Sequence, residues 1–391
     1  MSTKHAVKTF LENTLPLESL KKARRDYHAR RPPRPCGLTI HPGLGCPLGC
    51  RYCYIDDLGF DFKSAKPYGL TGLEIVYALI CNRYFIPGTS GTHLPFGSVT
   101  EPFLPILVSK TLEYMSNIGK HLGNPIQFST KMSISEEIAL KLRDIERYTP
   151  INPLVTIITP KINKTLEPNA PSIQDRYKTL KILRQKGLIP FVFLRPLLPS
   201  LTLEEIEEVL VEAKKHGAVG VVVGSLKISK KIYERLVTAN YKFSSKVEKI
   251  YDRLRGRKFI TIPHPLKNKI IEIAREKGLV AFKSACCANT FNIFMSTGKR
   301  IPCYNLCYID GSFCSNCPVN CVEHIPPVDE KDIEFAFKHS FGISVKKVIV
   351  EEKVIKVLVG SKNERNRVLA KRKTLKMLSS LYRHKITLIS P

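Results

Sequence analysis

Residues 45–54 read Gly45-Cys46-Pro47-Leu48-Gly49-Cys50-Arg51-Tyr52-Cys53-Tyr54, which places three cysteines in a Cys-x₃-Cys-x₂-Cys spacing. Glycine and proline between them disfavour a helix, so we expect a loop in which three thiolates converge on one metal centre. A structural zinc site is closed by four protein ligands. A four-iron four-sulfur cluster held by three cysteines instead keeps one iron open for a ligand that is not protein. The loop therefore favours an iron–sulfur cluster, and a zinc knuckle with a distant fourth ligand is the alternative.

The length and composition indicate a folded protein with two domains, or one large domain with an appendage. The chain has 391 residues, of which 43% are hydrophobic. The longest apolar runs, such as 189–194 and 219–223, are far shorter than the roughly 20 residues that span a bilayer. Residues 1–9 contain no apolar signal core. We therefore expect a cytoplasmic protein.

The charge is strongly basic and uneven. The net charge is +28, from 62 Lys and Arg against 34 Asp and Glu. Residues 1–35 hold nine basic and three acidic groups, and residues 361–391 hold nine basic groups and one acidic group. Basic ends on a metalloenzyme indicate a polyanionic partner, most simply nucleic acid. A solvated, non-specific surface is the alternative.

Short apolar strands alternate with helix-period segments from residue 37 onward. Such alternation gives a parallel sheet with crossover helices packed outside it. Thr202 with Glu205 forms a capping box at the start of one helix, and Ser133 with Glu136 at the start of another. Six units are too few to close an eight-unit barrel, so we expect an α/β fold with an open (β/α)₆ barrel over residues 37–240. The expected strands are 38–41, 93–98, 126–130, 154–158, 189–194 and 219–223.

Polar residues or glycine lie around or just after the ends of the last five expected strands. In barrels of parallel strands the chemistry gathers at the carboxyl ends of the strands. We therefore take these residues as candidates for a site, with helix caps and solvated loops as the alternative. They are Ser98, Thr100 and Glu101, then Ser129, Thr130 and Lys131, then Thr156 and Thr159, then Arg195, then Gly224 and Ser225.

The cysteine spacing, with Tyr52 just before Cys53, resembles the signature of the radical S-adenosylmethionine (SAM) enzymes. The usual core of that family is an open (β/α)₆ barrel, a partial TIM barrel. The resemblance implies that Cys46, Cys50 and Cys53 are catalytic and hold a [4Fe–4S] cluster. The open iron would chelate the amino and carboxylate groups of SAM. Reductive cleavage would then yield a 5′-deoxyadenosyl radical that abstracts hydrogen from a substrate.

Within that superfamily the chain is similar to the spore photoproduct lyase and DNA repair photolyase-like family over roughly residues 37–225. The resemblance implies that Ser98 and Glu101 face the methionine amino group of SAM. It places Lys131 at the SAM carboxylate and Thr156 at the ribose, and Tyr52 and Arg195 complete the candidate cofactor-binding set. Besides the cysteine loop, the shared motifs are Thr100-Glu101-Pro102-Phe103-Leu104-Pro105, Ser129-Thr130-Lys131, Leu166-Glu167-Pro168-Asn169-Ala170-Pro171, Arg176 and Arg195-Pro196-Leu197-Leu198-Pro199.

One departure from the lyase pattern concerns the end of the second strand. The lyase pattern has a cysteine there that returns a hydrogen atom to the product. Here the stretch is Phe96-Gly97-Ser98-Val99-Thr100, which has no thiol. We therefore do not expect this chain to be a spore photoproduct lyase.

A second group of cysteines follows the barrel, in residues 241–327. Clustered cysteines in a chain without a signal segment favour metal over disulfides. Four thiolates could close around one auxiliary iron–sulfur cluster or one zinc ion, and two centres are a further alternative. We take Cys303, Cys314, Cys317 and Cys321 as the candidate ligands, with His324 as a weaker one. The whole group is Cys286, Cys287, Cys303, Cys307, Cys314, Cys317 and Cys321.

Residues 328–391 are expected to form a small α+β appendage. Residues 329–339 have helical character, and the Val- and Ile-rich segments 345–350 and 354–359 could pair as a hairpin. Residues 365–381 form an expected basic helix. That helix is either a phosphate-binding surface or a solvated face. Residues 1–36 form a basic extension, with an expected helix from Pro16 to His28 ahead of a proline-rich segment.

The expected function is hydrogen abstraction from a nucleic acid, in modification or repair, with SAM and the cluster as cofactors. A ferredoxin- or flavodoxin-like protein would donate the electron. The two alternatives are a radical SAM enzyme that matures peptides or proteins, and a non-catalytic zinc protein that binds nucleic acid.

Overall fold

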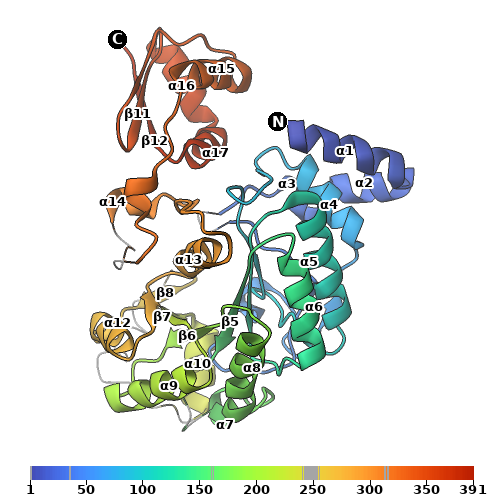
Figure 1. Cartoon of the computed structure of the whole chain (residues 1–391), viewed down its shortest axis with the longest axis vertical. Coiled ribbons are helices and arrows are strands. Elements are labelled where there is room, and N and C mark those ends of the chain that lie inside the picture. The colour runs from blue at the N-terminus through green and yellow to red at the C-terminus, as the bar shows by residue number, and fades with distance from the viewer. Residues whose placement is uncertain are drawn as a thin grey trace.

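The computed structural model describes residues 2–34, 37–159, 161, 163–239, 241, 254, 256–311, 314 and 317–391. A curled parallel sheet forms its centre (Figure 1). The strands lie in the order in which they occur in the chain, each parallel to the next. They are β3 (Leu94–Phe96), β4 (Ile126–Thr130), β5 (Ile151–Thr156), β6 (Phe191–Leu197) and β7 (Gly220–Ile228).

The expected first strand is present as an extended segment beside β3. Leu38 N donates to His93 O at 2.9 Å and Ile40 N donates to Pro95 O at 3.0 Å, but only Ile40 forms a bridge with Phe96. Five parallel strands and this extended segment therefore form a six-membered half-barrel, which confirms the predicted fold class.

Two further strands join this sheet from beyond residue 240. β9 (Val280–Phe282) pairs in parallel with β7, and β8 (Ile260–Ile262) pairs antiparallel with the end of β7. The cysteine-rich segment is therefore joined to the barrel by strand pairing as well as by sequence. Each of these strands has only three residues, which is too short to show an alternation of apolar and polar residues in the sequence. They are defined as strands by pairing with a neighbour.

The crossover helices lie outside the sheet (Figure 1). The side chain of Thr202 accepts from Glu205 N, and the Glu205 side chain accepts in return, which confirms this capping box. The predicted Ser133 cap is wrong, because Ser135 caps that helix by accepting from Ile138 N. The helices are α4 (Gly72–Cys81), α5 (Val108–Leu122), α6 (Glu136–Glu146), α8 (Ile173–Gln185), α9 (Leu203–Lys215) and α10 (Lys230–Thr238).

Helix α13 (Ala285–Thr297) closes one end of the half-barrel. Its Ala288 and Phe291 share a buried apolar cluster with Leu154 of β5 and Phe191 of β6. Gln127 of β4 donates to the carbonyl of Ala285 at 2.8 Å. The first turn of α13 is therefore tied to the inner face of the sheet. Helix α12 (Lys267–Glu276) packs beside β9 and α9.

The N-terminal extension is more helical than predicted. It holds α1 (Ser2–Thr14), α2 (Leu17–Arg25) and α3 (Tyr27–Arg30), all packed against α4. The expected single helix from 16 to 28 is divided at Asp26, whose backbone is extended and whose carboxylate accepts from His28 N as the cap of α3. α1 was not predicted, although its buried Leu11 joins the main core.

The C-terminal residues form a separate small core, with the predicted hairpin in place. The predicted helix 365–381 is instead two helices, α16 (Lys362–Ala370) and α17 (Arg372–Tyr382), because Lys371 leaves helical geometry at φ −97° and ψ 40°. β12 (Lys385–Ile389) was not predicted and pairs in parallel with β11. The other elements are α15 (Glu330–Phe341), β10 (Lys347–Val350) and β11 (Val354–Leu358).

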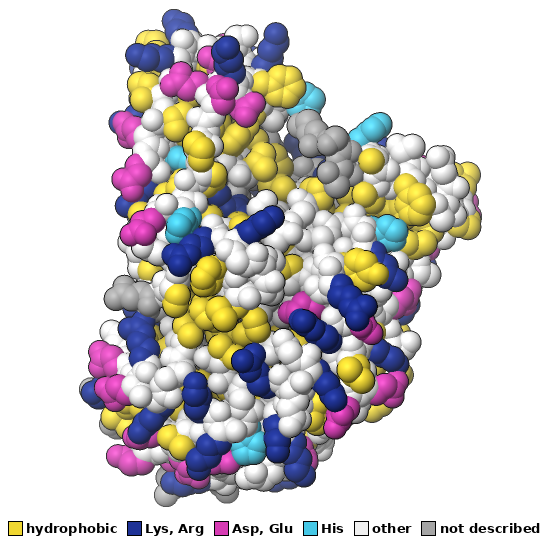
Figure 2. All heavy atoms as spheres, in the orientation of Figure 1, with side chains coloured by type: hydrophobic (Ala, Val, Ile, Leu, Met, Phe, Trp, Pro, Cys, Tyr) yellow, Lys and Arg dark blue, Asp and Glu magenta, His cyan; other side chains and the backbone are white. Residues whose placement is uncertain are grey.

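Arg383 joins this unit to the rest of the molecule. Its side chain donates to the carbonyl of Pro302 at 3.0 Å and to that of Ser90, and its own carbonyl accepts from the hydroxyl of Tyr308 at 2.8 Å. The outline of the molecule is notched between the C-terminal unit and the N-terminal helices, and Lys and Arg are spread over the visible face (Figure 2). No helix in the described ranges is both long and apolar enough to cross a membrane.

Candidate active site

The three-cysteine loop is held close to the loop that follows β3. Gly45 has φ +85°, and a Cβ there would lie 2.3 Å from the carbonyl oxygen of Ser64, so this position requires glycine. Gly45 N donates to Val99 O at 3.2 Å, and the hydroxyl of Thr100 donates to Gly45 O at 2.6 Å. Residues just after β3 thus position the start of the cysteine loop.

A second segment, residues 166–169, clasps the same loop from another side. Arg51 N donates to Leu166 O at 2.8 Å. Asn169 donates from its backbone to Leu48 O at 3.3 Å, and from its side chain to Pro47 O at 2.8 Å. The motif that contains these residues therefore supports the cysteine loop.

A buried charge pair lies under this clasp. The carboxylate of Glu167 accepts from the hydroxyl of Tyr52 and lies 2.5 Å from Arg176, and neither charged side chain is exposed to solvent. Arg176 also donates to the carbonyls of Thr156 and Pro171, each at 3.0 Å. Burial, followed by the charge of Glu167, raises the pKa of Tyr52. This network joins the cysteine loop to the end of β5.

Helix α10 provides a third clasp. The guanidinium of Arg235 donates to the carbonyl of Arg51 at 3.1 Å and to the carbonyl of Cys53, and it pairs with Asp56 at 2.5 Å. The hydroxyl of Ser229, at the start of α10, donates to Asp57 at 2.9 Å. The cysteine loop is thus enclosed by segments far apart in the sequence.

The three cysteines fit an iron–sulfur cluster. Burial raises the pKa of Cys46 to about 11 and raises that of Cys50 and Cys53 as well. A metal centre would supply the positive charge that makes such buried thiols into thiolates. In the described part of the chain, no three His, Cys, Asp or Glu side chains are placed to ligate one metal ion. The donor set of three thiols on one loop, with no fourth protein ligand in its sequence spacing, is the one that a [4Fe–4S] cluster with an open iron requires.

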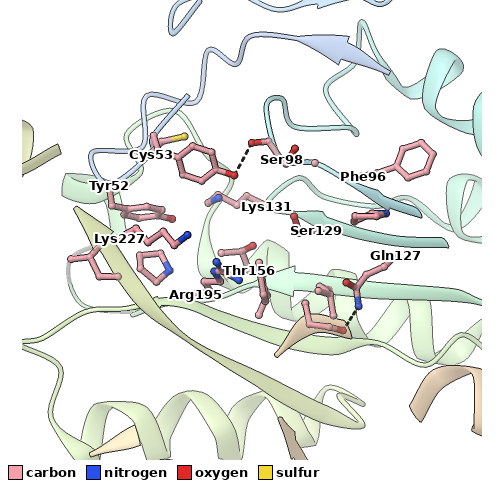
Figure 3. A pocket seen from close by; sticks show the side chains of 18 of the residues that line it. Tyr52, Cys53, Phe96, Ser98, Gln127, Ser129, Lys131, Thr156, Arg195 and Lys227 are labelled. Atoms are coloured by element: carbon pink, nitrogen blue, oxygen red, sulfur yellow. Dashed lines mark hydrogen bonds between the residues drawn. The ribbon is translucent and has the colours of Figure 1, made fainter. Parts of the chain in front are cut away.

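A cavity of about 290 Å³ opens beside Cys53, at the carboxyl ends of the strands (Figure 3). Its lining comes from the cysteine loop, from β3 to β7 and from the start of α13. Five of the six predicted cofactor-binding residues line it: Tyr52, Ser98, Lys131, Thr156 and Arg195. We refer to this cavity as the strand-end pocket.

The sixth, Glu101, lies behind the pocket wall and is not among the lining residues. Its side chain accepts from the hydroxyl of Thr130 at 2.6 Å, from Lys131 N at 2.9 Å and from Phe103 N at 3.2 Å. It is 6% exposed, and burial raises its pKa. In this geometry Glu101 fixes the loop after β4 to the loop after β3.

Lys131 is a cation of the pocket lining that lies beside the cysteine loop. Its Nζ lies 5.7 Å from the centre of the Tyr52 ring. Burial alone would lower the pKa of Lys131, but the nearby groups of Cys50, Glu167 and Glu101 outweigh it and raise the pKa. Lys131 is therefore held as a cation inside the pocket, where it can bind an anionic group.

Two further cations reach the pocket from neighbouring strands. Arg195 comes from β6, and Gly224 of β7 makes room for it, because a Cβ at that position would lie 2.5 Å from Cδ of Arg195. Lys227 of β7 also lines the pocket (Figure 3). Sequence reasoning missed Lys227, which lies near the end of a strand that was predicted to stop at residue 223. It also gave no role to Gln127 or Arg235.

The second cysteine group also converges. Burial and then Cys303, Cys317 and Cys287 raise the pKa of Cys321 to about 12. Burial and then Cys287, Cys317 and Cys303 raise the pKa of Cys314 to about 11. The four candidate ligands thus share one neighbourhood with Cys287, a residue that was not among them. Cys287 lies in the first turn of α13, and the packing of this helix on the sheet brings its thiol to the group.

Other members of this segment make different contacts. Cys286 Sγ lies 3.0 Å from the hydroxyl of Ser284, and Cys307 Sγ accepts from the side chain of Asn305 at 2.7 Å. The ring of His324 lies 3.4 Å from Arg300. A cation beside His324 makes it a poorer candidate for a metal ligand than the thiols.

Residues 40–213 match the family model described as the radical SAM superfamily. This matched part of the chain is a radical SAM superfamily segment. The family implies a [4Fe–4S] cluster and SAM as cofactors, and the matched range contains both the cysteine loop and most of the strand-end pocket. The matched segment therefore places the pocket where the fold brings strand ends and cysteines together.

Two curated relatives are similar over part of the chain. An uncharacterized protein of Methanocaldococcus jannaschii is 27% identical over 186 residues, which is 45% of this chain and 65% of that protein. An uncharacterized protein of Mycobacterium tuberculosis is 25% identical over 207 residues, which is 49% of this chain and 59% of that protein. The chain thus spans less than two thirds of each relative.

Solved structures of spore photoproduct lyase variants share the fold. One variant, with bound AdoMet and dinucleoside spore photoproduct, has a TM-score of 0.52 and 12% identity over 67% of this chain and 83% of that one. Another, with the dinucleoside spore photoproduct, has a TM-score of 0.51 and 13% identity over 66% and 79%. At this identity the likeness concerns the fold alone.

Proposed function

We propose that Cys46, Cys50 and Cys53 hold the [4Fe–4S] cluster and that SAM binds in the strand-end pocket beside Cys53. The observation that carries this proposal is the pocket itself, which brings residues from the cysteine loop and five strands around one cavity. The bound cofactors supply a 5′-deoxyadenosyl radical. The chain supplies orientation and exclusion of water.

The pocket residues suit the parts of SAM by their chemistry. Lys131 is a buried cation and suits the carboxylate of the methionine moiety. The hydroxyl groups of Ser98 and Thr156 can accept from an amino group or exchange hydrogen bonds with a ribose. Glu101 contributes indirectly, because it fixes the backbone of Lys131 and the loop that carries Ser98.

We also propose that the substrate is a nucleic acid. All charged side chains among the described residues that line the pocket are cations, namely Lys131, Arg195 and Lys227. With a net charge of +28, the protein would attract a polyanion and repel a basic peptide. The action is hydrogen abstraction from a base or sugar. A target within a duplex would have to be turned out of the stack to enter such a pocket.

We propose an auxiliary centre in the cysteine-rich segment, held by four of the five neighbouring thiols: Cys287, Cys303, Cys314, Cys317 and Cys321. An iron–sulfur cluster is favoured, and zinc with four thiolates is the alternative. Iron, sulfide and zinc analysis of protein purified without oxygen distinguishes the two.

A deuterium-transfer experiment tests the function. Nucleic acid from cells grown in heavy water is digested to fragments and given to the anaerobically reconstituted enzyme with unlabelled SAM and a reductant. Deuterium in the 5′-deoxyadenosine, seen by mass spectrometry, shows abstraction from nucleic acid. A deuterated peptide digest from the same cells is the matched control. Deuterium transfer from the peptides alone would overturn the nucleic-acid proposal.

A further inference from the structure

Three cavities adjoin one another along one side of the molecule. The strand-end pocket shares Tyr54 and Ser98 with a second cavity of about 390 Å³. The second shares Pro32 and Arg34 with a third, of about 50 Å³, at α17. The cavities therefore lie in series, and the hydroxyl of Tyr54 donates to the carbonyl of Ser98 at 3.0 Å between the second cavity and the strand-end pocket. We call the second and third cavities together, from α17 as far as Tyr54, the tyrosine groove.

Exposed cations border this groove. Arg31 and Arg34 come from the proline-rich N-terminal segment, and Lys373 and Lys376 come from α17. None of the four has an ion pair with a carboxylate in the described ranges of the chain. Among the described residues that line the three cavities there is no Asp or Glu, although the chain has 34 of them. The path is therefore suited to an anionic occupant.

Tyrosine side chains line the same groove. Tyr27 is 41% exposed, and Arg31 lies over its ring at 5.7 Å. The hydroxyl of Tyr68 is fixed by the carboxylate of Asp26 at 2.7 Å, and that carboxylate is also held by His28. These contacts restrict the rings of Tyr27 and Tyr68, so a base that stacks on them would cost little side-chain entropy. The groove's tyrosines are Tyr27, Tyr54, Tyr68, Tyr84 and Tyr304.

Cations together with aromatic rings in one groove suit one class of polyanion. Proteins that bind single strands combine a positive groove for the phosphates with aromatic side chains on which bases stack. A duplex keeps its bases inside and offers no base face to Tyr27 or Tyr84. An acidic peptide would use the cations but not the stacking surfaces.

The groove combines the two basic ends of the chain. The third cavity is lined by residues 32–34 and by Lys373 and Lys376 of α17, which places α17 beside the N-terminal segment. The four bordering cations all lie outside residues 40–213, the part that matches the family model. The family fold therefore does not by itself provide this groove.

We propose that a single-stranded nucleic acid lies along the tyrosine groove, with its phosphates on the arginines and lysines, its bases on the tyrosines, and one nucleotide delivered past Tyr54 to the strand-end pocket. This inference rests on the proposed nucleic-acid function. It adds that the nucleic acid is single-stranded and that it reaches the strand-end pocket along the tyrosine groove.

Fluorescence anisotropy with a labelled oligothymidylate tests it. K373Q/K376Q and R31Q/R34Q should each bind more weakly than the parent, and the slope of log affinity against log salt should fall by about 0.7 for each phosphate that is no longer neutralised. The matched control is K331Q/K338Q, which removes two exposed lysines from α15 of the same C-terminal unit, away from the groove. The control should keep the parent slope.

Tyr27→Leu separates stacking from charge. It should weaken oligothymidylate binding by about tenfold, the effect of removing one stacked base, with no change in salt slope. Circular dichroism confirms that each variant is folded.

The outcomes separate the groove from the function. If the parent binds the oligonucleotide and the groove variants bind it as tightly as the control does, the groove is overturned and the nucleic-acid function still stands. Tighter binding of a duplex than of the single strand would overturn the assignment to single strands. No binding of any nucleic acid by the parent would remove both proposals.

Discussion

Arg235 donates a hydrogen bond to the backbone carbonyl of Cys53, although the two residues are 182 positions apart in the chain. Arg235 lies on the helix after β7, and Cys53 is the last cysteine of the loop after the first extended segment of the half-barrel. The barrel therefore joins its two ends at the cysteine loop. The loop's geometry depends on this contact and on the clasp by residues 166–169.

We predict that Arg235→Gln loosens the cysteine loop. Charge-assisted hydrogen bonds contribute about 1.5–3 kcal/mol, so the free energy of unfolding should fall by a similar amount. Iron retained after anaerobic gel filtration should fall with it. Lys231→Gln, an exposed position on the same helix, is the control. Equal iron retention in both variants would show that Arg235 does not support the loop.

Breaking the buried pair of Glu167 and Arg176 should be costly. Either single change, Glu167→Gln or Arg176→Met, leaves one buried group without its partner and should lower the free energy of unfolding by about 3–5 kcal/mol. The double variant should be less destabilised than the sum of the two single variants. Denaturant unfolding of all four proteins measures this coupling, and strict additivity would speak against it.

Acid should destabilise the protein through His41. Burial, followed by the charge of His28, lowers the pKa of His41 to about 3, whereas the unfolded value is about 6.5. Between these values the unfolded chain binds a proton that the folded state does not, so stability rises with pH and is lost as pH falls below about 6.5. Asp26, Arg34 and the rings of Tyr27 and Tyr68 also face this region.

The size of this effect follows from the shift. One group contributes a slope of about 1.4 kcal/mol per pH unit within that window. Unfolding free energies from pH 7 to pH 5 should therefore fall less steeply in His41→Leu than in the parent. Parallel pH profiles for the two proteins would show that His41 does not titrate in this way.

Cys287→Ser should reduce the metal content of the auxiliary centre. The test uses the background C46A/C50A/C53A, so that the remaining metal reports on the second group alone. Cys81→Ser, a change in α4 that lies outside both groups, is the control. If Cys287→Ser keeps the metal of its background, the ligands are the other four thiols.

The half-barrel could be predicted because most of its strands and helices have a local signal, through apolar spacing and caps such as Ser172 and Thr202. β12 and β9 were not predicted, since they become strands through pairing with β11 and β7. The division at Lys371 was also missed, because both flanking segments have helical composition. Most of the predicted pocket residues were found because they follow strand ends. Arg235 and Cys287 could not be, because their contacts depend on distances between segments far apart in the chain.

The most direct test of the central claim is formation of 5′-deoxyadenosine from SAM by anaerobically reconstituted protein with a strong reductant, measured by mass spectrometry. The parent should form it, and C46A/C50A/C53A should form none while keeping the parent's circular dichroism. Equal amounts from the two proteins would contradict the assignment of Cys46, Cys50 and Cys53 to the cluster that cleaves SAM.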